Sequence, residues 1–114
     1  MFDCRIYLCV FSYSTQPGNI FVVSSAKEKY IPLIVEIDNN LSIKDCILNT
    51  LDSYIDNNIL NTFIQLIDIE KIDNNINIYY ACRLPIGSKL THGYNISYQY
   101  VSAEPIIRKC LYYV

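Results

Sequence analysis

The chain has 114 residues, of which 52% are hydrophobic and 18% are charged, and its formal net charge is −2. General disorder requires low hydrophobicity together with high net charge, so this composition excludes it. The arginines are Arg5, Arg83 and Arg108, and no segment gathers lysine or arginine into a run. Because basic side chains supply most of the affinity for nucleic acid, direct nucleic-acid binding is not expected.

The N-terminal third of the chain is expected to form three strands. Residues 4–13 are rich in β-branched and aromatic side chains, and residues 20–24 resume that pattern after a Pro-Gly turn. These two segments predict a β-hairpin. Residues 31–37 predict a third strand, with Pro32 near its start, where a missing N–H is tolerated.

The hydrophobic period becomes helical over residues 42–55, which predicts the main helix. Ser42 is the expected N-cap, and Asp45 follows three residues later in the manner of a capping box. One face of this helix is apolar and is formed by Ile43, Cys46, Ile47, Leu51, Tyr54 and Ile55. The opposite face is polar and is formed by Asp45, Asn49, Asp52 and Asp56.

The C-terminal half predicts three more strands and a short helix. Residues 61–71 alternate in part, residues 72–75 form a turn, and residues 76–84 alternate clearly. A loop then runs to Gly93, followed by a strand over residues 94–101 and a C-terminal helix over residues 103–112 that Ser102 would cap. We therefore expect one domain, residues 1–114, of the α/β (α+β) class, with a mixed β-sheet and these two helices.

The five cysteines are Cys4, Cys9, Cys46, Cys82 and Cys110. Their odd number and the absence of a C-x-x-C motif favour neither a complete disulfide framework nor a zinc site. We interpret them as buried free thiols, which indicates a reducing, cytoplasmic compartment, for example inside an infected host cell.

Neither a signal peptide nor an apolar run of about 18 residues is present, so no membrane partner is expected. Isoleucine, asparagine, tyrosine and lysine are abundant, and their codons are AT-rich. A viral, phage or parasite genome would explain that composition.

The order of the elements resembles the Nudix fold. Tyr30, Ile31 and Pro32 stand where that family has the strand leading into its signature loop. Residues 95–105, which contain Gln99-Tyr100-Val101-Ser102-Ala103-Glu104, look like the family's late strand before its last helix. The resemblance implies a signature G-x5-E-x7-R-E-U-x-E-E-x-G-U, with U aliphatic. Its glutamates lie on one helix and hold a divalent metal against a diphosphate.

The chain departs from that signature at its functional positions. No glycine lies between Gly18 and Gly87, and the chain contains neither an Arg-Glu nor a Glu-Glu pair. The positions near the expected Arg-Glu pair read Leu48-Asn49-Thr50, and those near the expected Glu-Glu pair read Asp52-Ser53-Tyr54. We therefore assign no catalytic, metal-binding or cofactor-binding residue and expect no cofactor.

Three other polar features have both a functional and a structural interpretation. Asp45, Asp52 and Asp56 form either a weak metal site or a solvated helix face. His92 is either a catalytic base or a surface histidine, and no neighbouring motif supports the first. The carboxylates of Asp68, Glu70 and Asp73 either take part in acid–base chemistry or form the polar, outer side of a strand. In each case we favour the structural interpretation.

Tyrosine is concentrated in the C-terminal half of the chain, where a core cannot easily bury all of it. Tyrosine is amphipathic and enriched in protein interfaces. We expect an apolar patch that binds a protein partner or a second copy, with Tyr94, Tyr98, Tyr100, Tyr112 and Tyr113 as candidate interface residues.

The predicted function is that of a non-catalytic protein-binding scaffold or an accessory subunit of a larger assembly, for example a viral or phage one. Two alternatives stay open. One is a nucleotide-binding module without hydrolysis, and the other is a divergent Nudix-type hydrolase of nucleoside-diphosphate-linked substrates that uses other carboxylates.

Overall fold

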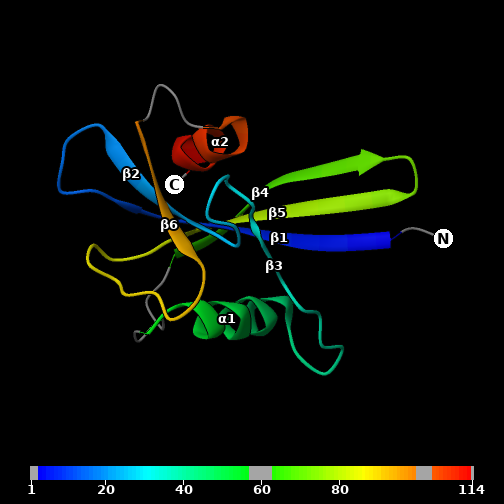
Figure 1. Cartoon of the computed structure of the whole chain (residues 1–114). Helices are drawn as coiled ribbons and strands as arrows, with labels where there is room; N and C mark the ends of the chain where they lie inside the picture. The colour runs from blue at the N-terminus through cyan, green and yellow to red at the C-terminus, as the bar shows by residue number, and fades with distance from the viewer. Residues whose placement is uncertain (1–2, 57–62, 100–103, 114) are drawn as a thin grey trace.

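The computed structural model describes residues 3–56, 63–99 and 104–113, the side chain of the last of these excepted. It shows a mixed β-sheet and two helices, as the sequence predicts. One helix lies on each face of the sheet (Figure 1). In chain order the elements are β1 (Asp3–Tyr13), β2 (Asn19–Ser24), β3 (Leu33–Ile34), α1 (Ile43–Tyr54), β4 (Phe63–Ile72), β5 (Asn75–Arg83), β6 (Tyr94–Gln99) and α2 (Pro105–Tyr113).

The strand β1 is the centre of the sheet, whose order is β4-β5-β1-β2-β6. Along one edge β1 pairs in parallel with the whole of β5. Along the other edge it pairs antiparallel first with β3, at Tyr7 and Leu8, and then with β2, from Val10 to Tyr13. The central part of β1, from Ile6 to Phe11, has neighbours on both edges and a hydrophobic cluster on each face, which suits its continuous run of apolar and aromatic residues.

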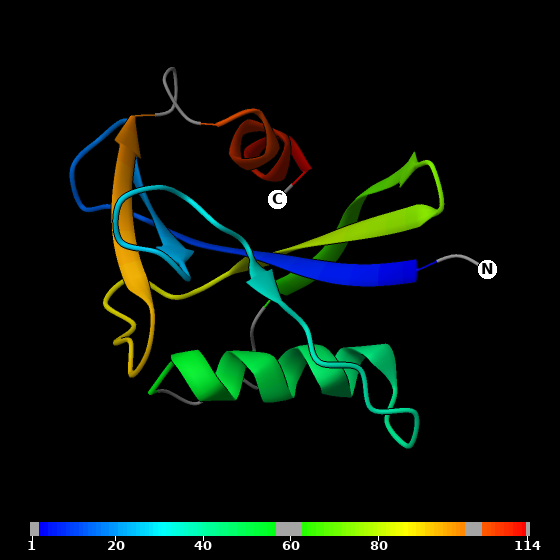
Figure 2. The same cartoon turned by 45° about the vertical axis from the view of Figure 1, so that its right-hand side comes forward.

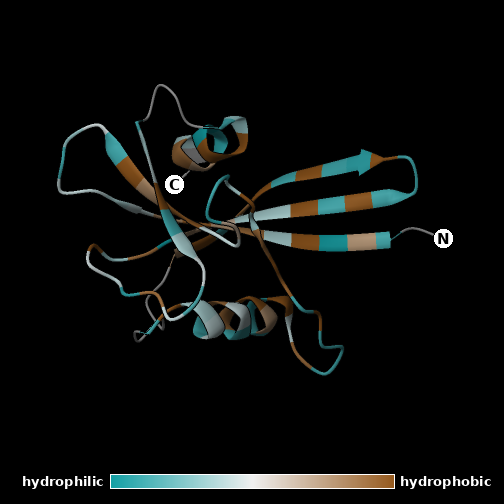
Figure 3. Cartoon of the chain, in the orientation of Figure 1, coloured by the Kyte–Doolittle hydropathy of each residue, from teal (hydrophilic) through white to brown (hydrophobic). Residues whose placement is uncertain are grey.

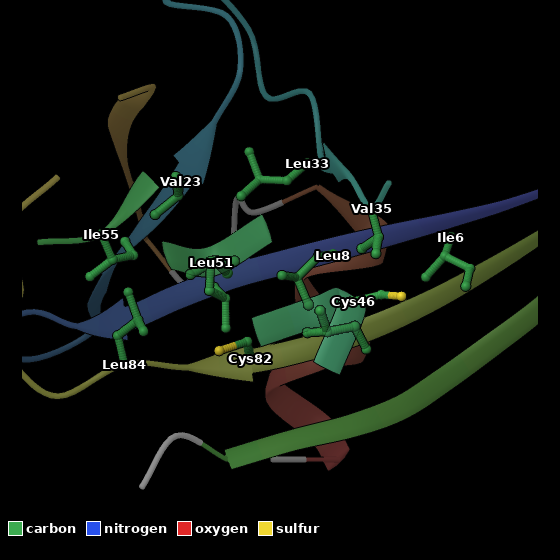
Figure 4. Packing of buried hydrophobic residues seen from close by; sticks show 12 residues of the cluster. Ile6, Leu8, Val23, Leu33, Val35, Cys46, Leu51, Ile55, Cys82 and Leu84 are labelled. Carbon is green, nitrogen blue, oxygen red and sulfur yellow. The ribbon is translucent and has the colours of Figure 1, made fainter. Parts of the chain in front are cut away.

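Two hydrophobic clusters occupy the two faces of the sheet. Ile6, Leu8 and Val10 of β1 belong to the cluster under α1, whereas Cys9 and Phe11 belong to the cluster under α2. Figure 4 shows the first cluster, in which side chains of α1 point toward β1 and β5. Along β4 and β5 hydrophobic and hydrophilic residues alternate (Figure 3). Because successive side chains of a strand point to opposite faces, alternate residues of β1 and of β5 contribute to the two clusters.

The main helix begins where the sequence predicts. The Ser42 hydroxyl accepts a hydrogen bond from the backbone N–H of Asp45 at 3.1 Å, so the predicted N-cap is confirmed. Most of the predicted apolar face is buried against the sheet. Ile43 is an exception, because it lies in the first turn beside the sheet edge and is 49% exposed.

Two elements differ in extent from the prediction. The predicted strand over residues 31–37 contains only two paired strand residues, Leu33 and Ile34. Val35 still donates its N–H to Ile6 O at 2.9 Å, but the chain then leaves the sheet for the turn at Asp38. The C-terminal helix starts at Pro105, a residue suited to a first helical position, and the predicted cap at Ser102 lies outside the described residues.

The cysteines are free thiols, as predicted, and four of the five are buried. The expectation of burial is wrong for Cys4, which is exposed near the start of β1. Neither α1 nor α2, the helices in the described part of the chain, is long and apolar enough to cross a membrane.

Candidate functional site

A pocket of about 1050 Å³ lies beside α1, and we refer to it as the α1 pocket. One wall is the connection from β3 to α1, which runs alongside the helix in Figure 2. The other wall is α1 itself, and the rim includes His92 from the loop before β6. The lining residues are Ile34, Glu36, Ile37, Asp38, Asn39, Asn40, Asn49, Thr50, Ser53, Tyr54 and His92.

Asp38 holds the first wall of the α1 pocket in place. Its carboxylate accepts the backbone N–H of Asn40 at 2.9 Å, and its carbonyl accepts the N–H of Leu41 at 3.0 Å. Its own N–H donates to the Cys46 sulfur of α1 at 3.4 Å. The turn before the helix is therefore fixed both to itself and to α1.

The end of the α1 pocket is closed by hydrogen bonds between α1 and the β5–β6 loop. The backbone N–H of Thr91 donates to Tyr54 O at 2.8 Å, and the Thr91 hydroxyl donates to Ser53 O at 3.2 Å. These bonds bring His92 to the rim, where its side chain is exposed as predicted. The sequence could not show this, because Ser53 and Thr91 are 38 positions apart.

The polar groups of α1 that line the pocket are uncharged. The Thr50 hydroxyl donates to Cys46 O at 3.1 Å, and the Ser53 hydroxyl donates to Asn49 O at 3.2 Å. The hydrogens of both hydroxyls are used within the helix, which leaves their oxygen lone pairs as acceptors. The charged side chains of the lining are the carboxylates of Glu36 and Asp38, and the lining contains no lysine or arginine.

The α1 pocket faces the same helix positions at which the resemblance implies metal-binding glutamates. The residues at or near those positions that reach the pocket are Asn49, Thr50, Ser53 and Tyr54. Within residues 3–56, 63–99 and 104–113, no three His, Cys, Asp or Glu side chains gather closely enough to hold a metal ion. The arrangement offers hydrogen-bond donors and acceptors but no metal site.

The acidic residues of β4 do not form a second site. Lys109 Nζ lies 2.9 Å from Asp68, and the Tyr79 hydroxyl donates to Glu70 at 3.2 Å. Asp73 is in the β4–β5 turn, where its φ is 53°. The carboxylates of Asp68 and Glu70 therefore each have a separate partner. Burial, with a contribution from the Glu70 charge, raises the pKa of Tyr79 to about 12.

Two thiols with shifted pKa values lie in the cluster under α2, away from the α1 pocket. Cys9 of β1 and Cys110 of α2 share a side-chain hydrogen bond, which lowers the pKa of Cys9 and raises that of Cys110. Burial, followed by the neighbouring Cys9, raises the pKa of Tyr30. Both thiols are almost fully buried, and they pack as small apolar side chains.

The candidate interface tyrosines lie in different surroundings. Tyr94 is 45% exposed on β6, and Tyr112 is 83% exposed on α2. Tyr98 is half-buried against the cluster under α2. Tyr100 and the side chain of Tyr113 lie outside the described residues.

The sequence did not reveal that the edge strand β4 carries several exposed apolar side chains. Its exposed side chains are Phe63, Leu66, Ile69 and Ile72. The signal was present as the alternation of residues 61–71, but the pattern alone does not show that this strand ends the sheet.

Comparison with known proteins supports the fold alone. No model of a known protein family matches the chain, and no curated protein matches it. A solved structure of the NUDIX domain of Shewanella oneidensis NrtR, complexed with ADP ribose, is similar in structure. It matches with a TM-score of 0.51 and 11% sequence identity over 83% of this chain and 72% of that chain. The chain therefore has a Nudix-like fold, which confirms the resemblance seen in the sequence.

Proposed function

We propose that this chain is a non-catalytic Nudix-like domain that acts as a protein-binding scaffold or as an accessory subunit of a larger assembly, for example in a virus or phage. The observation that carries the proposal is the composition of the α1 pocket. The helix face that would hold glutamates presents Asn49, Thr50, Ser53 and Tyr54 instead.

Hydrolysis of a diphosphate has little physical support at this site. A magnesium ion needs several hard oxygen ligands, with carboxylates among them to supply charge. The transferred or cleaved phosphate also needs cations to stabilise its developing charge. The lining of the α1 pocket contains two carboxylates on the loop side and neither lysine nor arginine.

Association with a protein is supported by exposed apolar side chains on β4 and α2. Ile69 and Ile72 of β4 are 59% and 54% exposed, and Tyr112 of α2 is 83% exposed. Exposed apolar side chains on the edge strand of a sheet are typical of protein interfaces. A partner protein or a second copy would remove this surface from water.

A second candidate function is the binding of a small molecule without hydrolysis. The volume of the α1 pocket, about 1050 Å³, supports it, because ligand pockets commonly have volumes of about 300–1,000 Å³. The structurally similar NUDIX domain was solved with ADP ribose. A nucleotide of this kind is therefore the first ligand to test.

The experiment combines a turnover assay, a thermal shift assay and light scattering on the full chain. We expect no magnesium-dependent hydrolysis of ADP ribose and a mass above that of the monomer, either alone or with a purified partner. A thermal shift with ADP ribose but no turnover would favour the second candidate, since a ligand stabilises the state that it binds. Magnesium-dependent turnover that is lost in Asp52→Ala would contradict both and establish a divergent hydrolase.

A further inference from the structure

We propose that the α1 pocket binds an ammonium or guanidinium group, supplied either by a free amine or by a lysine or arginine side chain of a partner protein. The inference rests on the proposed function, which takes this chain to act by binding. It adds the chemical class of the group that the pocket accepts.

The charge of the pocket lining favours a cation. Glu36 and Asp38 supply two carboxylates to the lining, which contains neither lysine nor arginine. One Asp38 oxygen accepts the Asn40 N–H, but neither carboxylate has an ion-pair partner among the described residues. Two unpaired carboxylates at one cavity attract a cation and repel a phosphate.

The orientation of α1 also favours a cation in the pocket. The pocket lies along the C-terminal half of the helix, at Asn49, Thr50, Ser53 and Tyr54. The carbonyl end of a helix carries a partial negative charge of about half an electron, which favours cations. The last turn of α1 contains no basic residue of its own. The helix end and the two carboxylates therefore contribute the same sign of potential to the pocket.

The uncharged groups of the lining suit an organic cation. The Asn39 and Asn49 amides offer carbonyl oxygens, which accept the N–H groups of an ammonium or guanidinium. Tyr54 offers an aromatic ring, whose face attracts organic cations. The ring is held in place by contact with Gly93, where a Cβ would stand 3.1 Å from it. Such a set suits an organic cation better than a bare metal ion.

The test is a titration of the isotope-labelled full chain, followed by NMR of its backbone amides at low ionic strength. The probes are agmatine, N-acetylarginine amide, inorganic pyrophosphate and magnesium chloride. We expect agmatine to shift the amides of Glu36, Asp38, Asn49 and Tyr54 and pyrophosphate to leave them unchanged. A shift with N-acetylarginine amide would identify a peptide side chain as a competent source, and a shift with agmatine alone would identify a free amine.

Charge-removing variants separate pocket binding from a general charge effect. Glu36→Gln should weaken agmatine binding roughly fivefold, the value expected from losing one charge near the ligand in water. Glu28→Gln removes an equal charge from an exposed loop residue that does not line the pocket and should leave the affinity unchanged. Equal weakening by both variants would overturn the proposal.

Three further outcomes would also overturn it: no shift with either organic cation, binding of pyrophosphate in the pocket, or the same shifts with magnesium at lower concentration. None of these would by itself refute a protein-binding scaffold, whose failure would appear as a monomer without a partner in the light-scattering experiment. The two proposals can therefore fail separately.

Discussion

The aromatic ring of Tyr54 lies against Gly93, so that a Cβ on residue 93 would stand 3.1 Å from the ring carbon Cδ1. The same Cβ would stand 2.9 Å from the carbonyl oxygen of Ser24. Gly93 also has a φ of +78°, a backbone angle that residues other than glycine rarely adopt. This contact fixes the start of β6 against the end of α1, at the rim of the α1 pocket.

Gly93→Ala should therefore lower the free energy of unfolding by roughly 2–3 kcal/mol, the sum of backbone strain and steric contact. Urea denaturation of the two proteins measures the difference. Gly18→Ala is the matched control, because Gly18 has a φ of +81° but open space around it. The control should lose only about 1 kcal/mol from strain. Equal losses would show that the Tyr54 and Ser24 contacts are unimportant.

The core under α1 depends on Leu51, whose side chain is fully buried among residues of β1 and β5. Leu51→Ala should reduce the free energy of unfolding by about 2–5 kcal/mol, because it removes buried apolar surface and leaves a cavity. Ile69→Ala on β4 is the control, since Ile69 is 59% exposed, and it should cost less than about 1 kcal/mol. Thermal or urea denaturation distinguishes the two, and similar losses would argue against the described position of α1.

The Ser42 cap can be tested at a single hydrogen bond. Ser42→Ala removes the acceptor for the Asp45 N–H and should cost about 1 kcal/mol in unfolding free energy. Ser53→Ala is the comparison, because its hydroxyl bonds only to Asn49 O within the same helix. That change should be close to neutral, since alanine is a better helix former than serine. A loss at Ser53 as large as that at Ser42 would contradict the cap.

The sequence predicts those parts of the fold that local periodicity and turn chemistry specify. The Pro17-Gly18 turn and the change of period after Ser42 are sufficient for the first hairpin and for α1. The predicted extent of the strand over residues 31–37 was wrong because alternating aliphatic residues fit an extended chain whether or not it pairs with a neighbouring strand. Only the tertiary position of Val35, beyond the end of β3, shows that pairing stops there.

The α1 pocket could be predicted only in part. The absence of glutamate near Thr50 and Tyr54 was visible in the sequence, and the structure shows that these residues line a pocket. The sequence did not show that Glu36 and His92 line the pocket, because their positions depend on the path of two loops beside α1. The exposure of β4 likewise depends on sheet order, which a strand pattern does not encode.

The pH dependence of stability should include a fall above pH 9 that originates at Cys82. Burial raises the pKa of this thiol from 9.0 to about 12. The unfolded chain therefore ionises at a lower pH than the folded one, so stability is full below pH 9 and is lost as the pH rises toward 12. Between pH 7 and about pH 10.5 the loss from this thiol should be roughly 1–2 kcal/mol.

Urea denaturation at both pH values measures this loss, and Cys82→Ala should reduce it after the constant cost of the cavity is subtracted. Cys4→Ala is the control, because Cys4 is exposed and its removal should leave the pH dependence unchanged. The same pH dependence in all three proteins would exclude Cys82 as its source.

The exposed tyrosine of α2 offers a direct test of association. Tyr112 is 83% exposed and lines a smaller hollow of about 370 Å³ with Tyr13, Arg108 and Leu111. If this surface is an interface, Tyr112→Ser should weaken association about tenfold, a typical effect for a tyrosine at an interface centre. Light scattering over a concentration series gives the dissociation constant. Ile86→Ser is the control, because Ile86 is 62% exposed in the distant β5–β6 loop and its loss should leave that constant unchanged. A protein that remains monomeric at all concentrations, with and without its purified partner, would remove the tyrosines of α2 from consideration as an interface.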